Sequence, residues 1–441
     1  MIPKHNVLIA TFFIAPLFTF SQENSVYSRY GLGNLVPAGN VLNKGMGGVS
    51  AGYADPATVN FVNPASYSGL VYTTLDIGAQ VDSRTITSQT PAGKFTSNNA
   101  FISYLQLGVP LLNGNKKAMK RKVSWGMNIG LRPISRINYK VANYGRVNGI
   151  DSLITIYEGN GGANEAMIGT GVKIKNLSVG LNLGYLFGSK DYNTQLVFVN
   201  DSIQYQKSNS STKTNFGGIL FRGGLQYAIP LKKDDKQNGV LRLGAYGNLQ
   251  QKINAKQDIV RETFLFNSET GSADKLDSVY DAVDQKGKII YPSTVGVGFV
   301  VEKSHLIFGA DFEMTNWDNY SFYGNRDFVQ NNWTVKTGFQ YFPALSSSTK
   351  FWNFVRYRAG FAFGPDYISI DKKLPQYTLS AGLGVPLKIK RSFYETQYSV
   401  MNLGVEYGTR GNNSNNVKEN ILRISIGFAL GDVWFRRVKY Q

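Results

Sequence analysis

From about residue 72 onward, apolar and polar residues alternate along the chain with a period of two. Between Leu177 and Gly188 the apolar residues occupy the odd positions, and Ser, Gly and Asn fill most of the even ones. Alternation over about twelve residues is twice the length of an ordinary globular strand. It matches a tilted strand that crosses a bilayer, which needs about 9–11 residues. The pattern therefore predicts membrane-spanning β-strands.

The same alternation recurs in later stretches, at 306–314, 355–363, 377–387 and 421–430. One face of each stretch is apolar, and the opposite face carries charged, Gly or small residues. In an outer-membrane barrel the apolar face meets lipid and the polar face lines the lumen. Charges in the lumen predict salt bridges that hold a plug, in preference to a catalytic carboxylate pair or a ligand site. The charged side chains placed inside are Asp311, Glu313, Arg356, Arg358, Glu406 and Arg423.

Connection lengths distinguish a barrel from a soluble β-sandwich. Fourteen strand-like runs can be counted, and six short turns alternate strictly with seven long loops between them. A closed antiparallel barrel with both termini on the periplasmic side predicts this alternation, whereas a sandwich does not. The short turns are expected near 112–120, 175–176, 231–237, 303, 345–350 and 389–392. The long loops are expected near 84–97, 135–161, 189–211, 253–290, 316–330, 365–375 and 409–417.

The N-terminus has the features of an export signal. Lys4 and His5 precede an apolar run from Val7 to Phe20, which is too short to span a bilayer as a helix, and small residues precede Gln22. This is the pattern of a cleaved secretory signal peptide. We therefore expect a signal peptide at 1–21, a periplasmic or lumenal segment at 22–71, a transmembrane barrel at 72–430 and a basic periplasmic tail at 431–441.

Composition and charge remove several classes of function. The chain has no Cys and two His, at positions 5 and 305, so thiolate and His-based metal sites and a Ser-His-Asp triad are not expected. We expect no enzyme, no cofactor and no metal. The net charge is +18, and Lys and Arg concentrate in the predicted short turns and at the C-terminus. This is typical of a rim that anchors a barrel at the membrane interface. Because export removes the chain from nucleic acid, no such partner is expected.

A segment rich in Gly and Ala, residues 45–70, precedes the first strand and has too few bulky residues to form a core of its own. In Asp55-Pro56 and Asn63-Pro64, the Asx side chain is suited to cap a short helix that begins with Pro. Such a thin element fits inside a fourteen-stranded barrel, whose lumen is too wide for its own side chains to fill. The segment lacks the strand and the Gly-Lys-Ser/Thr of a phosphate-binding loop. We therefore expect it to pack as a plug against the inner wall.

This segment resembles the N-terminal hatch of the FadL-type outer-membrane transporters of long-chain fatty acids and other hydrophobic compounds. Stretches between 294 and 388 resemble that family's last third. The end of the chain, from 424 to 440, is similar to the termini of outer-membrane proteins from Bacteroidetes-like bacteria. The residues that match the hatch, and that the resemblance places on a ligand path, are Gly47, Gly48, Asp55, Asn63, Pro64 and Ala65.

The resemblance implies an all-β barrel of about fourteen strands with a lumenal hatch, and passive uptake of a hydrophobic small molecule. In the family, the ligand leaves sideways through a gap that a kink in an early strand makes. The equivalent here is the third strand, where Gly126, Gly130 and Pro133 would permit a bend.

The predicted charges make the lumen polar, which does not suit a path for hydrophobic molecules. A second interpretation, in which the chain transports nothing, therefore stays open. The family also contains accessory barrels, such as the shuttle barrel of type IX secretion. The chain would then be a subunit of an outer-membrane protein secretion or assembly complex. The stretches 141–165 and 259–288 would hold a protein partner or be ordinary surface loops. A generic porin fits least, because a plug blocks an open channel. Expected partners are outer-membrane lipid and either a hydrophobic ligand or a protein of the outer membrane or cell surface.

Overall fold

The structure, a computed structural model, describes most of the chain. The described residues are 25–112, 122–147, 151–199, 205–231, 239–266, 273–343, 350–370, 372–387 and 398–434. The predicted signal peptide and most of the predicted basic tail lie outside them.

One sheet contains all the strands. In chain order they are β1 (Asn34–Leu35), β2 (Thr73–Gln89), β3 (Ala92–Pro110), β4 (Val123–Val147), β5 (Asp151–Ile174), β6 (Leu177–Phe198), β7 (Lys207–Leu231), β8 (Gly239–Asn248), β9 (Gln251–Phe266), β10 (Ala273–Tyr291), β11 (Thr294–Lys303), β12 (Leu306–Thr315), β13 (Ser321–Phe322), β14 (Asn332–Tyr341), β15 (Arg356–Ser369), β16 (Lys373–Pro386), β17 (Tyr398–Arg410) and β18 (Val417–Asp432). The helical elements are η2 (Val26–Arg29), α2 (Val41–Gly45), η3 (Pro64–Gly69), η4 (Trp317–Asn319) and η5 (Phe351–Phe354). Within the described ranges, no helix is long and apolar enough to cross a membrane.

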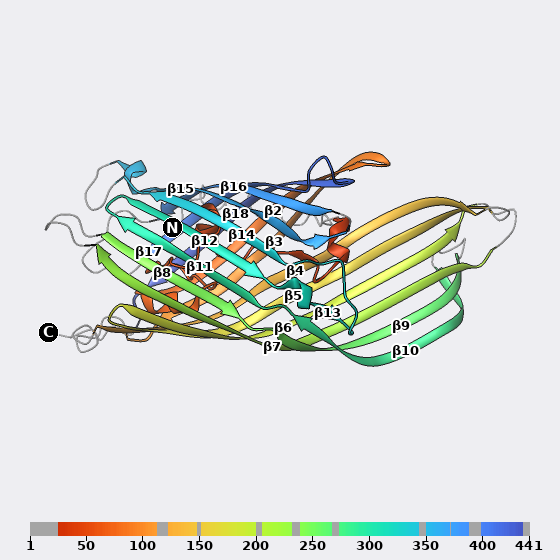
Figure 1. Cartoon of the computed structure of the whole chain (residues 1–441), viewed down its shortest axis with the longest axis horizontal. Helices are drawn as coiled ribbons and strands as arrows, with labels where there is room; N and C mark the ends of the chain where they lie inside the picture. The colour runs from red at the N-terminus through yellow and green to blue at the C-terminus, as the bar shows by residue number, and fades with distance from the viewer. Residues whose placement is uncertain are drawn as a thin grey trace, which may run out of the picture.

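The sheet closes on itself as an antiparallel barrel (Figure 1). The last strand, β18, pairs along its length with β2, from Asp432 opposite Thr73 to Val417 opposite Ser88. Of the eighteen strands, β1 and β13 have two residues each. In addition, β8 with β9, and β10 with β11, are the halves of two long strands that pair half against half. Leaving out β1 and β13, and counting each of these two pairs as one strand, gives fourteen, so the prediction of a fourteen-stranded antiparallel barrel is confirmed.

The outer surface of the barrel is apolar, as the alternation predicts. In β6, the odd residues from Leu177 to Phe187 are exposed on the outside, and the even residues from Ser178 to Leu186 are buried. A soluble sheet would bury its apolar face, whereas a membrane barrel turns that face to lipid.

Five of the predicted long loops are largely β-strand instead, and one of them, 365–375, is occupied by β15 up to Ser369 and by β16 from Lys373. The predicted loop 135–161 is occupied by β4 and β5, which pair out to Val147 opposite Asp151. The predicted loops 84–97, 189–211 and 253–290 are likewise filled mostly by paired strands. Outside a bilayer neither face of a strand has to be apolar. These continuations therefore lack the alternation that identifies a membrane strand from sequence.

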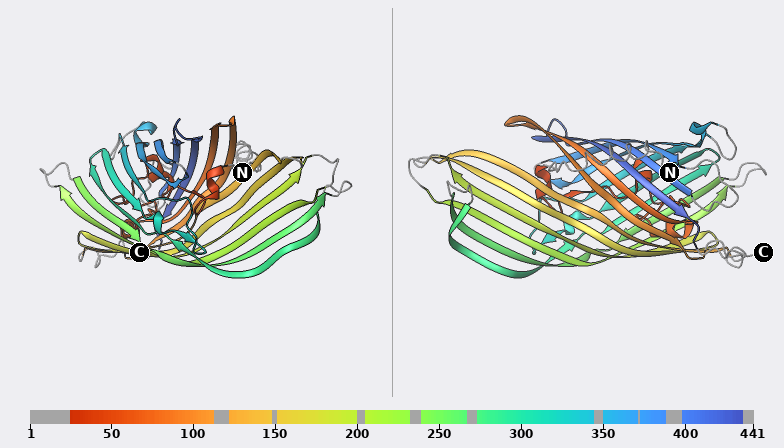
Figure 2. Two further views of the ribbon diagram at one scale, coloured as in Figure 1. Left: turned by 45° about the vertical axis from the view of Figure 1, so that its right-hand side comes forward. Right: turned by 180° about the vertical axis from the view of Figure 1, so that it is seen from behind.

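Six strands run past the barrel as a curved sheet, which we call the extension (Figure 2). It contains the outer parts of β4, β5, β6, β7, β9 and β10, in that order, so its two edges are β4 and β10. Close to its base, β8 ends at Asn248 and β11 begins at Thr294. The row of paired residues at its base is Ser135, Ala163, Gly188, Phe216, Ala255 and Gly287.

The N-terminal segment, residues 25–72, lies inside the barrel, as the red ribbon of Figure 1 shows. Nearly all of its residues from 39 to 70 are buried. Asn63 caps η3 by accepting the N–H of Ala65 at 3.1 Å, with Pro64 at the first helical position, as predicted. Asp55 accepts the N–H of Ala57 at 2.9 Å, but no helix follows it.

Candidate functional site

The inner wall meets the N-terminal segment at a ring of glycines. A Cβ atom at Gly126 of β4 would overlap the carbonyl oxygen of Tyr67, and one at Gly244 of β8 would overlap that of Ala51. Backbone held in a close-packed interior cannot move aside as a flexible side chain can. These wall positions therefore accept only Gly while the segment is in place. Other wall glycines that meet backbone atoms of the segment are Gly171, Gly180, Gly338 and Gly360.

Polar side chains of the wall satisfy backbone groups of the segment. One carboxylate oxygen of Asp311, on β12, accepts the N–H groups of Ser50 at 2.6 Å and Ala51 at 2.8 Å. On β2, Asp76 accepts the N–H of Val59 at 3.1 Å. A segment with so little regular structure leaves many backbone groups without internal partners, and burial of such groups is costly. The wall supplies the missing acceptors.

The predicted hatch residues help to pack the N-terminal segment against the wall. Gly47 and Gly48 have φ angles of +66° and +86°, which turn the chain after α2. The N–H of Gly47 donates to Ser380 Oγ at 3.0 Å. Asn63 donates to the carbonyl oxygen of Ala51 at 2.7 Å. The predicted ligand-path residues thus lie in contact with wall and segment, and Gly47 and Gly48 also line the lumenal cavity described below.

Two of the predicted lumenal charges bind the segment directly. Arg356 pairs with Asp55 at 3.0 Å, and Asp311 holds the two N–H groups described above. Glu313 pairs with Lys336 at 3.1 Å and accepts the hydroxyl of Tyr246. Because both Asp311 and Glu313 are engaged in this way, their geometry does not favour a catalytic pair.

The other predicted charges are buried among wall residues. Arg358 donates from Nε to Gln340 at 2.6 Å and from one terminal nitrogen to Asn402 at 2.9 Å. Arg423 Nε lies 3.9 Å from Asp82. Glu406 is 6% exposed and lies in the lining of the lumenal cavity. The contacts of Arg358 join β15 to β14 and β17, and the contact of Arg423 joins β18 to β2.

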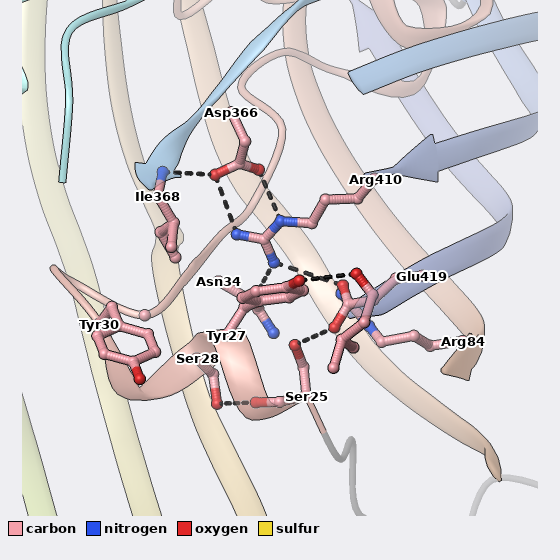
Figure 3. Close-up of polar contacts among 12 residues, drawn as sticks. Ser25, Tyr27, Ser28, Tyr30, Asn34, Arg84, Asp366, Ile368, Arg410 and Glu419 are labelled. Atoms are coloured by element: carbon pink, nitrogen blue, oxygen red, sulfur yellow. Dashed lines mark hydrogen bonds and ion pairs between the residues drawn. The ribbon is translucent and has the colours of Figure 1, made fainter. Parts of the chain in front are cut away.

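A second polar cluster, which the sequence did not indicate, anchors the start of the segment (Figure 3). Arg410 of β17 lies 2.7 Å from Asp366 through Nε and 3.4 Å from Glu419 through a terminal nitrogen. The same terminal nitrogen donates to Asn34 of the segment at 2.9 Å. Glu419 in turn accepts the hydroxyl of Ser25 at 2.5 Å. No periodic pattern links these residues, because hundreds of positions separate the segment from β17 and β18.

Residues 29–33 are held by the extension and its neighbours. Lys190 of β6 donates to the carbonyl oxygen of Gly31 and lies 3.0 Å from the hydroxyl of Tyr320. Asp327 accepts the N–H of Gly31 at 2.7 Å. Burial lowers the pKa of Lys190 to about 8, although the carboxylate of Asp327 acts to raise it.

The lumen contains a cavity whose lining includes several charged side chains. A cavity of about 280 Å³ lies between the segment and the wall. Its charged lining residues are Lys44, Arg132, Arg222, Glu313, Lys336, Glu406 and Arg423. Among the described residues, no three His, Asp or Glu side chains gather as a metal site would need. This cavity suits water and ions better than a hydrophobic molecule.

A gap opens in the barrel wall where β3 and β4 stop pairing with each other. Their described pairing runs from Pro110 opposite Gly126 to Leu105 opposite Leu131, and β4 then bulges between Pro133 and Ser135. Of the predicted kink residues, Pro133 therefore lies at the bulge. Gly126 and Gly130 lie in the paired part below it, where they face Tyr67 and Gln106.

A cavity of about 730 Å³ lies where the wall parts. Its lining includes Phe101, Ile102, Leu105, Phe187 and Phe216, together with Arg132 and Arg136. Above the gap, β1 pairs with β4 in place of β3, and the N–H of Val36 donates to the carbonyl oxygen of Ile134 at 2.9 Å. The segment thus occupies an edge of β4 that β3 leaves free.

Similar solved structures include the toluene transporter TodX of Pseudomonas putida, with a TM-score of 0.57 and 14% identity over 91% of this chain and 100% of that one. They also include the monoaromatic hydrocarbon channel CymD, with a TM-score of 0.51 and 15% identity over 90% and 98% of the two chains. A FadL homologue of Pseudomonas aeruginosa has a TM-score of 0.54 and 12% identity over 90% and 99%.

At such low identity these likenesses show a shared fold, that of the FadL-type barrel. No curated protein matches the sequence. The family model of BamG, in contrast, matches residues 1–441, which is the whole chain. The chain therefore belongs to the BamG family.

Proposed function

We propose that this chain is an outer-membrane barrel closed permanently by its own N-terminal segment, and that it acts as a non-transporting subunit of an outer-membrane protein complex. In this proposal a cleaved signal peptide exports the chain, and residues 25–72 form the plug. The complex serves protein secretion or barrel assembly, and membership of the BamG family supports this subunit role over transport.

The fit between the wall glycines and the backbone of the segment carries this proposal. A plug that moves aside would leave Gly126 and Gly244 facing an empty lumen, and would leave the carboxylate of Asp311 without the N–H groups of Ser50 and Ala51. Loss of a buried hydrogen-bond partner costs about 1–3 kcal/mol per group. Many such contacts surround the segment, so its withdrawal is strongly opposed.

Passive uptake of a hydrophobic small molecule, of the long-chain fatty acid kind, is the second candidate. Its support is the shared fold with named hydrocarbon channels and the cavity at the gap between β3 and β4. Phe101, Ile102 and Phe216 give that cavity an apolar part. The polar lumenal cavity, with Lys44 and Arg423 in its lining, argues against a continuous apolar path from outside.

Purification from the native membrane in mild detergent, with mass spectrometry of lipids and proteins from the same sample, tests both candidates. An unrelated tagged outer-membrane barrel at matched expression is the control. A stoichiometric protein partner without a bound lipophile supports the subunit proposal. A lone barrel with a stoichiometric fatty acid or hydrocarbon supports uptake and overturns the subunit proposal.

A further inference from the structure

The outer part of β10, the free edge of the extension, is unusually exposed. Among residues 274–286 only Ser278 and Ala282 are half-buried, and the others are exposed. The neighbouring elements reach only its base, where Ile289 and Ile290 pair with β13 and the hydroxyl of Tyr323 donates to the carbonyl oxygen of Gln285 at 2.9 Å. Farther out, the described pairing of β10 is with β9 alone.

This edge carries a row of exposed apolar side chains. The register between β10 and β9 shifts between Lys275 and Asp277, between Ser278 and Tyr280, and between Ala282 and Gln285. Each shift leaves an aliphatic residue out of the ladder, so three bulges present three aliphatic side chains. Leu276, Val279 and Val283 are 47%, 75% and 66% exposed, and Tyr280 between them is 52% exposed.

Protection of the edge against pairing with other strands explains why β10 has bulges. It does not explain why the side chains in the bulges are apolar and exposed. Bulges and charged residues commonly stop the edge of a sheet from pairing with other strands. Polar residues in the bulges would serve that purpose without exposing apolar surface. A row of apolar side chains on a protruding edge instead indicates a contact surface. Because the ladder is interrupted three times, the contact is made by side chains and not by addition of a strand.

The charges beside this row restrict what can bind it. Asp277 and Asp281 are exposed along the same edge, and Lys275 is already 3.8 Å from Glu262 of β9. Lys286 and Lys288 are exposed on the same strand but lie nearer its base. A second copy of this chain, docked edge to edge about a two-fold axis at Val279, would bring Asp277 of one copy against Asp281 of the other. Lipid is excluded by position, because Val283 is eight residues outward from Tyr291, or about 26 Å along a strand. β11 alone, with its ten residues, is long enough to cross the bilayer.

We propose that the outer edge of β10 docks another protein, outside the membrane, through a surface on that protein with an apolar centre and basic residues around it. Leu276, Val279, Tyr280 and Val283 provide the apolar contact, and Asp277 and Asp281 provide the complementary charge. This inference rests on the proposed function and identifies which surface of the subunit meets its neighbour.

Site-specific photo-crosslinking in intact cells tests it. A benzoylphenylalanine probe replaces Val279 or Val283 on β10, and the control replaces Tyr144, which is 76% exposed on β4 at the opposite edge of the same sheet. We expect one protein to be crosslinked from Val279 and Val283 at least tenfold more than from Tyr144. The crosslinked peptide of that protein should carry Lys or Arg beside apolar residues.

A charge reversal completes the test. The double variant Asp277→Lys with Asp281→Lys should lower the crosslink from Val283 at least tenfold, whereas Lys140→Glu with Arg146→Glu on β4 should leave it unchanged. Heat-modifiable migration in gels confirms that each barrel is folded. Equal crosslinking from both edges, crosslinking to lipid or to a second copy, or insensitivity to the reversal overturns the inference.

Failure of the inference can be told apart from failure of the proposed function. If a partner protein co-purifies but is crosslinked only from positions other than β10, this edge is not the docking surface and the subunit role stands. If no protein co-purifies at all and a lipophile is bound, the subunit role itself is wrong.

Discussion

The barrel and the extension are built from the same strands but are completed in different ways. Within the barrel, the inner face of the wall is covered by the chain's own N-terminal segment, and wall groups such as Asp311 and Ser380 bond its backbone. In the extension the sheet is a single layer, and the outer part of β10 is exposed. The first region is filled from within, and the second has surface that nothing in the described chain covers.

This difference implies that the residues that stabilise the fold and the residues that bind a partner lie in different regions of the molecule. Residues between the wall and the segment are buried, paired and tightly packed, so substitutions there should change the free energy of unfolding. Residues at the edge of the extension contact little, so substitutions there should change association and leave the barrel stable. Four variants test this contrast, in order of decreasing effect on stability.

The largest loss is expected at Arg410. Its replacement by Met leaves Asp366 and Glu419 buried with less compensation, and breaking a buried ion pair costs about 3–5 kcal/mol. The unfolding midpoint in denaturant, followed by heat-modifiable migration, measures this. Arg261→Met is the control, because Arg261 in the extension bonds carbonyl and hydroxyl oxygens of β7. Equal shifts of the unfolding midpoint in the two variants would contradict the proposed difference between the barrel and the extension.

Adjacent glycines of β7 provide a test of the close fit in the barrel. A Cβ at Gly224 would overlap the side-chain oxygen of Asn63, whereas one at Gly223 would meet nothing within 4 Å. Gly224→Val should destabilise the barrel by about 3 kcal/mol through overpacking. It should also make residues 25–72 accessible to an added protease. Gly223→Val should do neither, and a tolerated Gly224→Val would contradict a permanent plug.

A smaller loss is expected at Asp311. In Asp311→Asn, an amide oxygen replaces the charged acceptor of the N–H groups of Ser50 and Ala51, and neutral hydrogen bonds are weaker than charged ones. We expect a loss of about 1–2 kcal/mol, measured as a shift of the denaturant midpoint. The exposed Asp281, changed to Asn in the same way, should shift it by less than about 0.5 kcal/mol.

The smallest change in stability is expected at the edge of β10. Replacing Leu276, Val279 and Val283 together by Ser should alter the unfolding free energy by less than about 0.5 kcal/mol per site, because these side chains are exposed. Co-purification of the partner should nevertheless be lost. A strongly destabilised triple variant would mean that these residues belong to a core of the extension and not to a contact surface.

The sequence predicts the barrel far better than the extension. In β6, the alternation from Leu177 to Phe187 is imposed by lipid outside and a polar lumen inside, and it is visible without any structure. From Ser189 to Phe198 the same strand continues beyond the barrel, where no lipid requires one face to be apolar, so no alternation marks it and the sequence predicts a loop there. The outer half of β10 was missed for the same reason.

For the site, the sequence by itself determined the local chemistry of the segment. It indicated the Asn63 cap and the inward direction of Asp311 and Arg356, because these follow from side-chain type and strand period. Only the tertiary structure decided the partners. That Asp311 receives Ser50 and Ala51, that Asp55 meets Arg356, and that Arg410 joins Asp366, Glu419 and Asn34 depends on how a closed sheet brings distant strands around the segment. The two-residue period of a strand predicts which face of the sheet a residue occupies. The register between strands and the closure of the barrel determine which residues it contacts.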